Sequence, residues 1–111
     1  MDEITKRNYL YDFYGALLTE RQKEVYEDYV LNDLSLGEIA EELSISRAAV
    51  HDMIKRSDKI LDNYEQKLHL MERYLENKAL MERIRDLTRL EDQQEALIRI
   101  RQQIDDFLEK L

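Results

Sequence analysis

Proline is absent from the 111 residues of this chain, and glycine occurs only twice, as Gly15 and Gly37. These two residue types are the strongest breakers of regular helix. A chain that almost lacks them, and is rich in Glu, Leu, Arg, Lys and Ile, is typical of a protein that is nearly all helical. We therefore predict an all-α fold. The length fits one compact domain, or a small domain with an appendage.

Composition narrows the classes of protein further. The absence of Cys excludes a disulfide framework and any thiolate metal site. The chain has no long apolar run, and charge follows Met1, so we expect no membrane insertion, no signal peptide and a cytoplasmic location. The net charge of −8 argues against tight, non-specific binding of nucleic acid, because neutralising phosphates supplies most of that affinity. A local basic face remains compatible with this charge.

Three helix-start signals stand within 28 residues of one another. Thr19 with Gln22, and Ser35 with Glu38, form capping boxes, in which each side chain satisfies a free amide of the first turn. Ser46 follows a tight turn at Ser44 and can cap another helix. The signals predict helices over about residues 3–17, 20–31, 36–43 and from 47 onward.

The C-terminal part reads as paired amphipathic helices. Apolar residues recur every three or four positions, which is the spacing of one helical stripe. Thr88 and Glu91 form a further capping box and predict a last helix over residues 89–110. The two stripes are Leu61, Tyr64, Leu68, Met71 and Leu75, then Leu97, Ile100, Ile104, Phe107 and Leu111. We expect a helix-turn-helix domain over residues 1–68 and an amphipathic helical hairpin over 69–111 that serves oligomerisation, with one continuous compact unit as the alternative. Whether the helix after Ser46 is continuous through residue 86 is left open.

The stretch from Ser35 to Ile54 has the pattern of a helix-turn-helix. A small residue at the helix crossing and apolar residues on both sides let two short helices pack at a steep angle. The predicted core consists of Ile39, Ala40, Leu43, Ile45, Val50 and Ile54. Ser44 occupies the turn position that is commonly Gly in such motifs. The alternative is a plain helical corner in a bundle.

Residues 18–61 resemble region 4 of bacterial sigma factors, through Leu-Thr-Glu-Arg-Gln-Lys-Glu-Val from Leu18 and Ser-Leu-Gly-Glu-Ile-Ala-Glu-Glu-Leu-Ser-Ile-Ser from Ser35. Two further stretches are Tyr-Asp-Phe-Tyr-Gly-Ala-Leu-Leu-Thr from Tyr11 and Tyr-Glu-Gln-Lys-Leu from Tyr64. Through them the chain also resembles the YlxM family of small bacterial proteins, which are encoded beside signal recognition particle genes. The resemblance covers about residues 5–75. It implies a helix-turn-helix regulator that acts in the signal recognition particle pathway.

The helix that begins at Arg47 is the candidate reading helix. Residues 46–60 hold four basic and two acidic side chains, a local charge of +2, so the rest of the chain carries −10. Candidate nucleic-acid contacts there are Ser46, Arg47, Ala48, His51, Lys55, Arg56 and Lys59, with Arg47 and Ala48 near base edges and Lys55, Arg56 and Lys59 near phosphates. The comparison with sigma factors adds Arg21 and Lys23 as phosphate contacts. Asp52 lies in the outward face and would repel phosphate, so modest and salt-sensitive DNA binding is expected. Ordinary solvated charges are the alternative.

Nothing in the sequence marks an enzyme. His51 and His69 are the only histidines, and no metal-binding spacing or glycine-rich phosphate loop occurs. We expect no catalysis, no cofactor, no metal and no small-molecule substrate. Three roles remain: a DNA-binding regulator, a module that binds a protein or ribonucleoprotein such as the signal recognition particle, and an assembly adaptor that works through its C-terminal helices. The apolar C-terminal helices predict a homodimer, as in many helix-turn-helix proteins.

Overall fold

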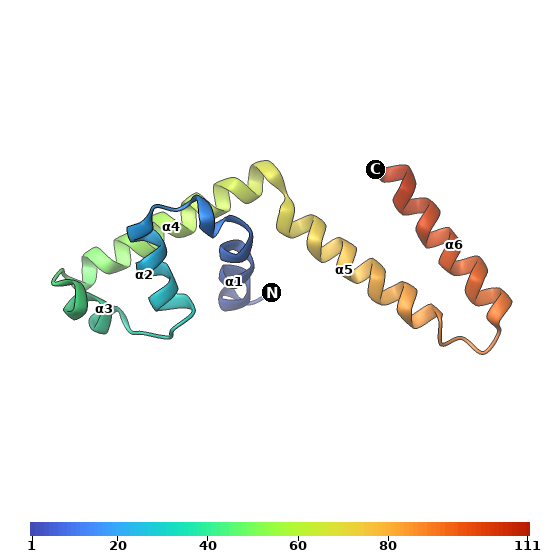
Figure 1. Cartoon of the computed structure of the whole chain (residues 1–111), viewed down its shortest axis with the longest axis horizontal. Coiled ribbons are helices and arrows are strands. Elements are labelled where there is room, and N and C mark those ends of the chain that lie inside the picture. Colours follow the sequence, from blue (N-terminus) through green and yellow to red (C-terminus); the bar gives the residue numbers. More distant parts are fainter. The chain divides into compact units, whose positions relative to one another are not determined.

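The computed structural model describes all residues from Met1 to Leu111 and confirms the all-α prediction, because it contains helices and no strand. The elements are α1 (Glu3–Tyr14), the 3-10 turn η1 (Gly15–Leu17), α2 (Glu20–Val30), α3 (Leu36–Leu43), α4 (Arg47–Leu68), α5 (Leu70–Leu87) and α6 (Gln93–Lys110). The chain divides into two compact units, the N-terminal unit Met1–Met71 and the C-terminal unit Glu72–Leu111 (Figure 1). No helix has both the length and the apolar character that a membrane span requires.

In the N-terminal unit, α1, α2 and α3 all pack against the long helix α4. Figure 1 shows these three helices gathered on one side of α4. Their shared core consists of Leu10, Tyr14, Leu18, Val25, Tyr26, Ile39, Ala40, Val50, Ile54 and Leu61. The aromatic residues of α1 and α2 pack inside the unit, and the rings of Tyr11 and Tyr26 stack at 5.5 Å between centroids. Burial of this set is the main force that holds α4 against the other helices.

The helix starts in this unit follow the predicted caps. Thr19 and Ser35 each accept from the amide three residues on, and Gln22 and Glu38 accept from the amides of their caps, so both capping boxes are present. Ser46 accepts from the Ala49 amide and opens α4. The first helix ends earlier than expected: α1 stops at Tyr14, and η1 continues to Leu17 as a tighter 3-10 turn.

A left-handed residue separates α4 from α5. His69 has φ 56° and ψ 30°, which ends α4 at Leu68, and the predicted stripe from Leu61 to Leu75 therefore does not lie on one helix. The Tyr14 hydroxyl donates to Glu65 Oε1 at 2.6 Å and accepts from the Leu70 amide at 3.1 Å. Glu65 Oε1 also accepts from the Met71 amide at 2.9 Å.

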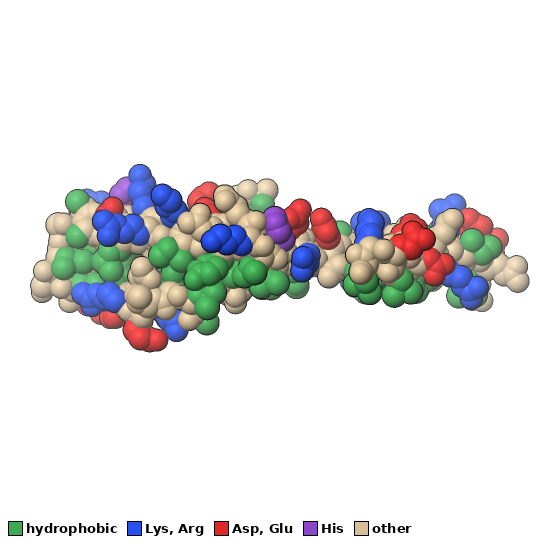
Figure 2. Space-filling model, turned by 90° about the horizontal axis from the view of Figure 1, so that it is seen from above, with side chains coloured by type: hydrophobic (Ala, Val, Ile, Leu, Met, Phe, Trp, Pro, Cys, Tyr) green, Lys and Arg blue, Asp and Glu red, His purple; other side chains and the backbone are tan.

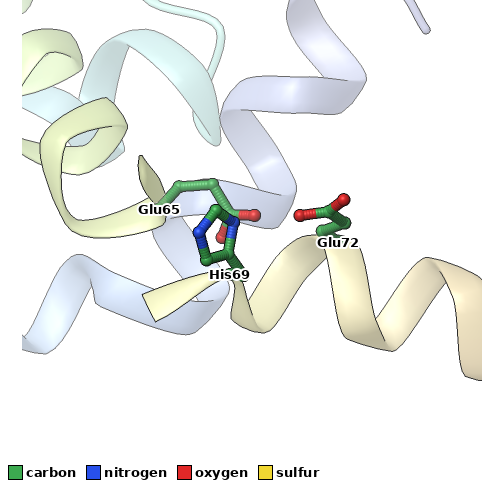
Figure 3. A group of neighbouring side chains, drawn as sticks. All are labelled: Glu65, His69 and Glu72. Atoms are coloured by element: carbon green, nitrogen blue, oxygen red, sulfur yellow. The ribbon is translucent and has the colours of Figure 1, made fainter. Parts of the chain in front are cut away.

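Figure 3 shows Glu65 with the His69 imidazole beside it, and ligand-type atoms of the two lie within 4.8 Å of each other. The Glu65 carboxylate also accepts the hydrogen bonds from Tyr14 and Met71 described above.

The C-terminal unit joins α5 and α6 through a short loop, and it corrects one predicted helix start. Thr88 does not cap a helix. Its hydroxyl donates instead to the Arg85 carbonyl at the end of α5. Asp92 is the cap of α6, and its carboxylate accepts from the amides of Gln94 and Glu95. The last helix therefore begins at Gln93 rather than at residue 89.

Candidate nucleic-acid interface

The turn between α3 and α4 is built from backbone hydrogen bonds around a left-handed serine. Ser44 has φ 57° and ψ 42°, a conformation in which Gly is the favoured residue. The Ile45 amide donates to the Ala40 carbonyl at 3.0 Å, and the Ser44 amide donates to the Glu41 carbonyl at 3.3 Å. These bonds satisfy the last carbonyls of α3 in the manner of a helix C-cap, so the chain can turn within three residues.

The six residues of the predicted helix-turn-helix core lie at the contact between α3 and α4. Ile39, Ala40, Val50 and Ile54 are buried. Leu43 and Ile45 are half-buried and pack against the same core. The small side chain of Ala40 lets α4 pass close to α3, and these two helices make the most extensive contact between any two elements. The arrangement fixes which face of α4 remains open.

The outward face of α4 carries the candidate contact residues. Ser46, Arg47, Ala48, His51, Lys55, Arg56 and Lys59 are all exposed. Arg47 lies beside the first turn of α3, where a methyl group added at Gly37 would sit 3.9 Å from the Arg47 Cδ. That distance is an ordinary van der Waals contact, so the stem of Arg47 packs beside α3 without depending on the glycine.

Ion pairs within the chain sort the basic residues of α4 into two groups. Arg56 Nε lies 3.0 Å from Asp52 Oδ2, one helical turn away, so the repulsive carboxylate of Asp52 is paired by its neighbour. Arg47, Lys55 and Lys59 make no ion pair in the structure. These three cations are therefore the ones that remain available to a nucleic acid.

The second acidic residue of α4, Asp58, is turned toward the body of the unit. Arg7 of α1 donates to it through Nε at 3.2 Å and through a terminal nitrogen at 2.8 Å. The Tyr26 hydroxyl donates to Asp58 Oδ1 at 2.6 Å. The hydrogen bond with Asp58 raises the pKa of Arg7. Burial, followed by the hydrogen bond to Asp58, raises the pKa of Tyr26. The network removes one negative charge from the outward surface of α4.

Arg21 and Lys23 on α2 are paired locally. Arg21 lies 3.8 Å from Glu24, and Lys23 lies 3.3 Å from Glu20. Neither makes a hydrogen bond or an ion pair with α4, so the structure does not join them to Lys55 and Lys59. Figure 2 shows the Lys and Arg side chains of the N-terminal unit in separate groups on the face in view, with hydrophobic side chains between some of them.

A compact unit of short helices, with two of them joined by a tight turn and a basic face on the second, defines a helix-turn-helix protein. Residues 1–104 match the family described as "Putative helix-turn-helix protein, YlxM / p13 like". The chain belongs to this family.

Two bacterial relatives match over almost the whole chain. A UPF0122 protein of Bacillus licheniformis is 46% identical over 111 residues, which covers 100% of this chain and 97% of the relative. The UPF0122 protein YlxM of Bacillus subtilis (strain 168) is 42% identical over 108 residues, which covers 95% of this chain and 98% of the relative.

Two residues that shape the candidate interface are not among the predicted candidates. Arg7 and Tyr26 never reach the outward face, yet they hold Asp58 away from it. One feature of the sequence indicates that Asp58 faces the body of the unit. Asp58 is eight residues from Val50, which places it about 80° round the helix from that buried residue and so at the edge of the inner face.

Proposed function

We propose that this chain binds nucleic acid through the outward face of α4, as a non-catalytic helix-turn-helix regulator in the cytoplasm. The observation that carries the proposal is the separation of charges on α4. Asp52 is paired with Arg56 and Asp58 with Arg7, while Arg47, Lys55 and Lys59 are exposed and unpaired. Duplex DNA is the expected form of nucleic acid, because a helix of this kind fits the major groove.

Three cations give a modest and salt-sensitive affinity. Each phosphate contact contributes about −0.9 to the slope of log K against log salt concentration, so the two contacts expected of Lys55 and Lys59 give a slope of about −1.8. The net charge of the N-terminal unit opposes binding to phosphates, since the whole unit holds nine basic and fifteen acidic residues and so carries −6. Binding is therefore expected to be detectable at low salt and weak at moderate salt.

The test is a fluorescence anisotropy titration of a labelled DNA duplex at several salt concentrations. The Arg47→Ala/Lys55→Ala variant should lower the slope to about −0.9, because one phosphate contact remains. The matched control is Asp52→Ala/Arg56→Ala, which removes a paired cation together with its partner and should leave the slope unchanged. Asp52→Asn alone releases Arg56 and should make the slope steeper. Undetectable binding of the unaltered protein at low salt would overturn the proposal.

The second candidate function is binding to a protein or a ribonucleoprotein. The −6 charge of the N-terminal unit favours it, because an acidic surface suits a basic protein partner. The local pairing of Arg21 and Lys23 also favours it, since it confines the unpaired cations to α4. The resemblance to the YlxM family implies the signal recognition particle, through its protein or its RNA, as that partner. A pull-down from native lysate with and without nuclease distinguishes the candidates: a protein retained after nuclease treatment supports the second.

A further inference from the structure

The two helices of the C-terminal unit each carry an apolar face that is broader than their mutual contact covers. On each helix, one row of apolar residues is covered, and we call it the covered edge. It consists of Leu80, Ile84 and Leu87 on α5 and of Ala96, Ile100 and Phe107 on α6, and among these Leu80 and Ala96 are buried. A second row remains exposed: Tyr74 (43%) and Met81 (55%) on α5, with Leu97 (66%), Ile104 (44%) and Leu108 (56%) on α6. Helix faces of this width are typical of proteins in which each helix packs against two neighbours.

The two exposed rows lie on the same side of the hairpin. At about 100° per residue, the exposed row lies about 100° round the helix from the covered edge on α5 and about 80° on α6, in the same rotational sense. Because α5 and α6 run antiparallel, equal senses of rotation bring both rows to one side. Figure 2 shows hydrophobic side chains, in green, along one border of the hairpin. The hairpin therefore presents one apolar face on this side, and exposed Ile98 (60%) lies outside it.

The hairpin itself is loosely packed. A groove of about 870 Å³ runs between α5 and α6. Leu80, Phe107 and Leu111 line it together with charged residues such as Arg83 and Asp106. Two helices separated in this way do not fill the space between them, and unfilled space costs stability.

The charges that border the apolar face suit a second copy of the same hairpin. Lys78 and Glu82 on α5, and Arg101 and Asp105 on α6, flank the exposed rows, and each of them is exposed. None of the four makes an ion pair within the chain. The C-terminal unit as a whole holds eight basic and ten acidic residues, a net charge of −2, so two copies repel each other only weakly through this unit.

We propose that two copies of this chain join through these faces as a four-helix bundle with a two-fold axis parallel to the helices. This symmetry places α5 of one copy antiparallel to α6 of the second, with both loops at one end. Counting outward from the loop, Lys78 then comes level with Asp105 of the second copy and Glu82 with Arg101, each within about one helical turn. The two-fold axis makes both pairs twice.

The area available matches what a stable dimer needs. The half-exposed side chains of the apolar face offer on the order of 400 Å² of apolar surface per copy. A standard interface buries about 800 Å² per partner, of which somewhat more than half is apolar. The dimer stands apart from the nucleic-acid proposal, because it uses no residue of α4 and needs no nucleic acid.

The test is sedimentation equilibrium of the full chain in buffer without nucleic acid. The unaltered protein should be dimeric at tens of micromolar. Lys78→Glu, and separately Asp105→Lys, should raise the dimer Kd at least about tenfold, since each replaces two attractions with two repulsions. The combined variant Lys78→Glu/Asp105→Lys should recover most of the affinity. The matched control Lys67→Glu changes a lysine of α4 and should leave the Kd unchanged.

Leu97→Glu places a charge in the middle of the apolar face and should raise the dimer Kd more than about a hundredfold. Circular dichroism of each variant separates loss of the dimer from loss of the fold. A monomer at tens of micromolar would overturn the proposal, and so would failure of the combined variant to recover affinity, because the two reversals then do not face each other.

Discussion

Arg7 of α1 holds the carboxylate of Asp58 of α4 through two hydrogen bonds, at 3.2 and 2.8 Å. The guanidinium also lies over the ring of Tyr29, 5.8 Å from its centroid. Both side chains of the pair are about one-fifth exposed, 22% each. This clamp ties the first helix of the chain to the helix that carries the candidate interface.

Loss of the clamp should destabilise the N-terminal unit. Asp58→Ala is expected to lower the free energy of unfolding by about 2 kcal/mol, because it leaves Arg7 and Tyr26 without their acceptor. The matched control is Asp62→Ala on the same helix. Asp62 lies 3.5 Å from Lys6 in an exposed pair, which contributes about 0–1 kcal/mol. Urea denaturation followed by circular dichroism measures both changes, and equal losses from the two variants would contradict the role of the clamp.

The left-handed turn at Ser44 offers a stabilising substitution. Ser44→Gly should raise the free energy of unfolding by about 1 kcal/mol, because Gly adopts positive φ without the steric cost of a Cβ. Ser44→Val should lower it, since a β-branched side chain fits this conformation least well. Thermal unfolding of the two variants beside the unaltered protein tests the prediction. A destabilised Ser44→Gly variant would show that the serine contributes more than its backbone conformation.

The two glycines should respond to alanine with opposite signs. A Cβ at Gly15 would lie 2.7–2.9 Å from ring atoms of Tyr11. Gly15→Ala must therefore displace the Tyr11 ring, which stacks on Tyr26 and whose hydroxyl donates to Glu27, at a cost of about 1–3 kcal/mol. At Gly37 the nearest atom is 3.8 Å away, so Gly37→Ala should stabilise α3 by about 0.5–1 kcal/mol. Chemical denaturation of both variants provides the comparison, and the sign of each change decides it.

Alkaline pH should weaken the N-terminal unit through its buried tyrosines. Burial raises the pKa of Tyr26, and hydrogen bonding to Asp58 raises it further. Burial likewise raises the pKa of Tyr14, which donates to Glu65. Above the ordinary tyrosine pKa of about 10, the unfolded chain loses phenolic protons that the folded chain retains, so stability falls as pH rises. Below that pH the contribution is fully present.

Denaturation midpoints from pH 8 to pH 11 measure this effect, and phenolate absorbance at 295 nm follows the ionisation. Tyr26→Phe should reduce the dependence on pH while lowering stability at pH 8, because Asp58 loses one donor. Exposed Tyr74 in the C-terminal unit provides the control position for Tyr→Phe. A midpoint that does not change above pH 10 would contradict the prediction.

The local features of the fold could be predicted because they depend on neighbouring residues. The caps at Thr19, Ser35 and Ser46 need only a side chain and an amide three residues on. The same reasoning was wrong at Thr88, because Thr88 and Asp92, four residues apart, are both residue types that can cap the last helix. Asp92 accepts from two amides, whereas the Thr88 hydroxyl finds a carbonyl in the turn behind it.

The tertiary features were harder to predict. The break at His69 depends on hydrogen bonds that Tyr14 and Glu65 make with the first residues of α5, and Tyr14 is more than fifty residues away in the sequence. The pairing of Asp58 with Arg7 is equally remote, at a separation of 51 residues. Helical periodicity places each side chain on a face of its own helix but does not say which other helix meets it. The net charge of α4 can therefore be predicted from its sequence, whereas the division of its charges between the inner and outer faces depends on the helices that pack against it.

Because Arg7 and Asp58 form an ion pair, a substitution at one of these positions changes which residues are tolerated at the other. A relative that lost the cation at position 7 while keeping the carboxylate would carry an unbalanced negative charge on the helix of Lys55 and Lys59. Selection should then favour a neutral residue at position 58 as well. Among descendants of a common ancestor, the two sites are expected to change together.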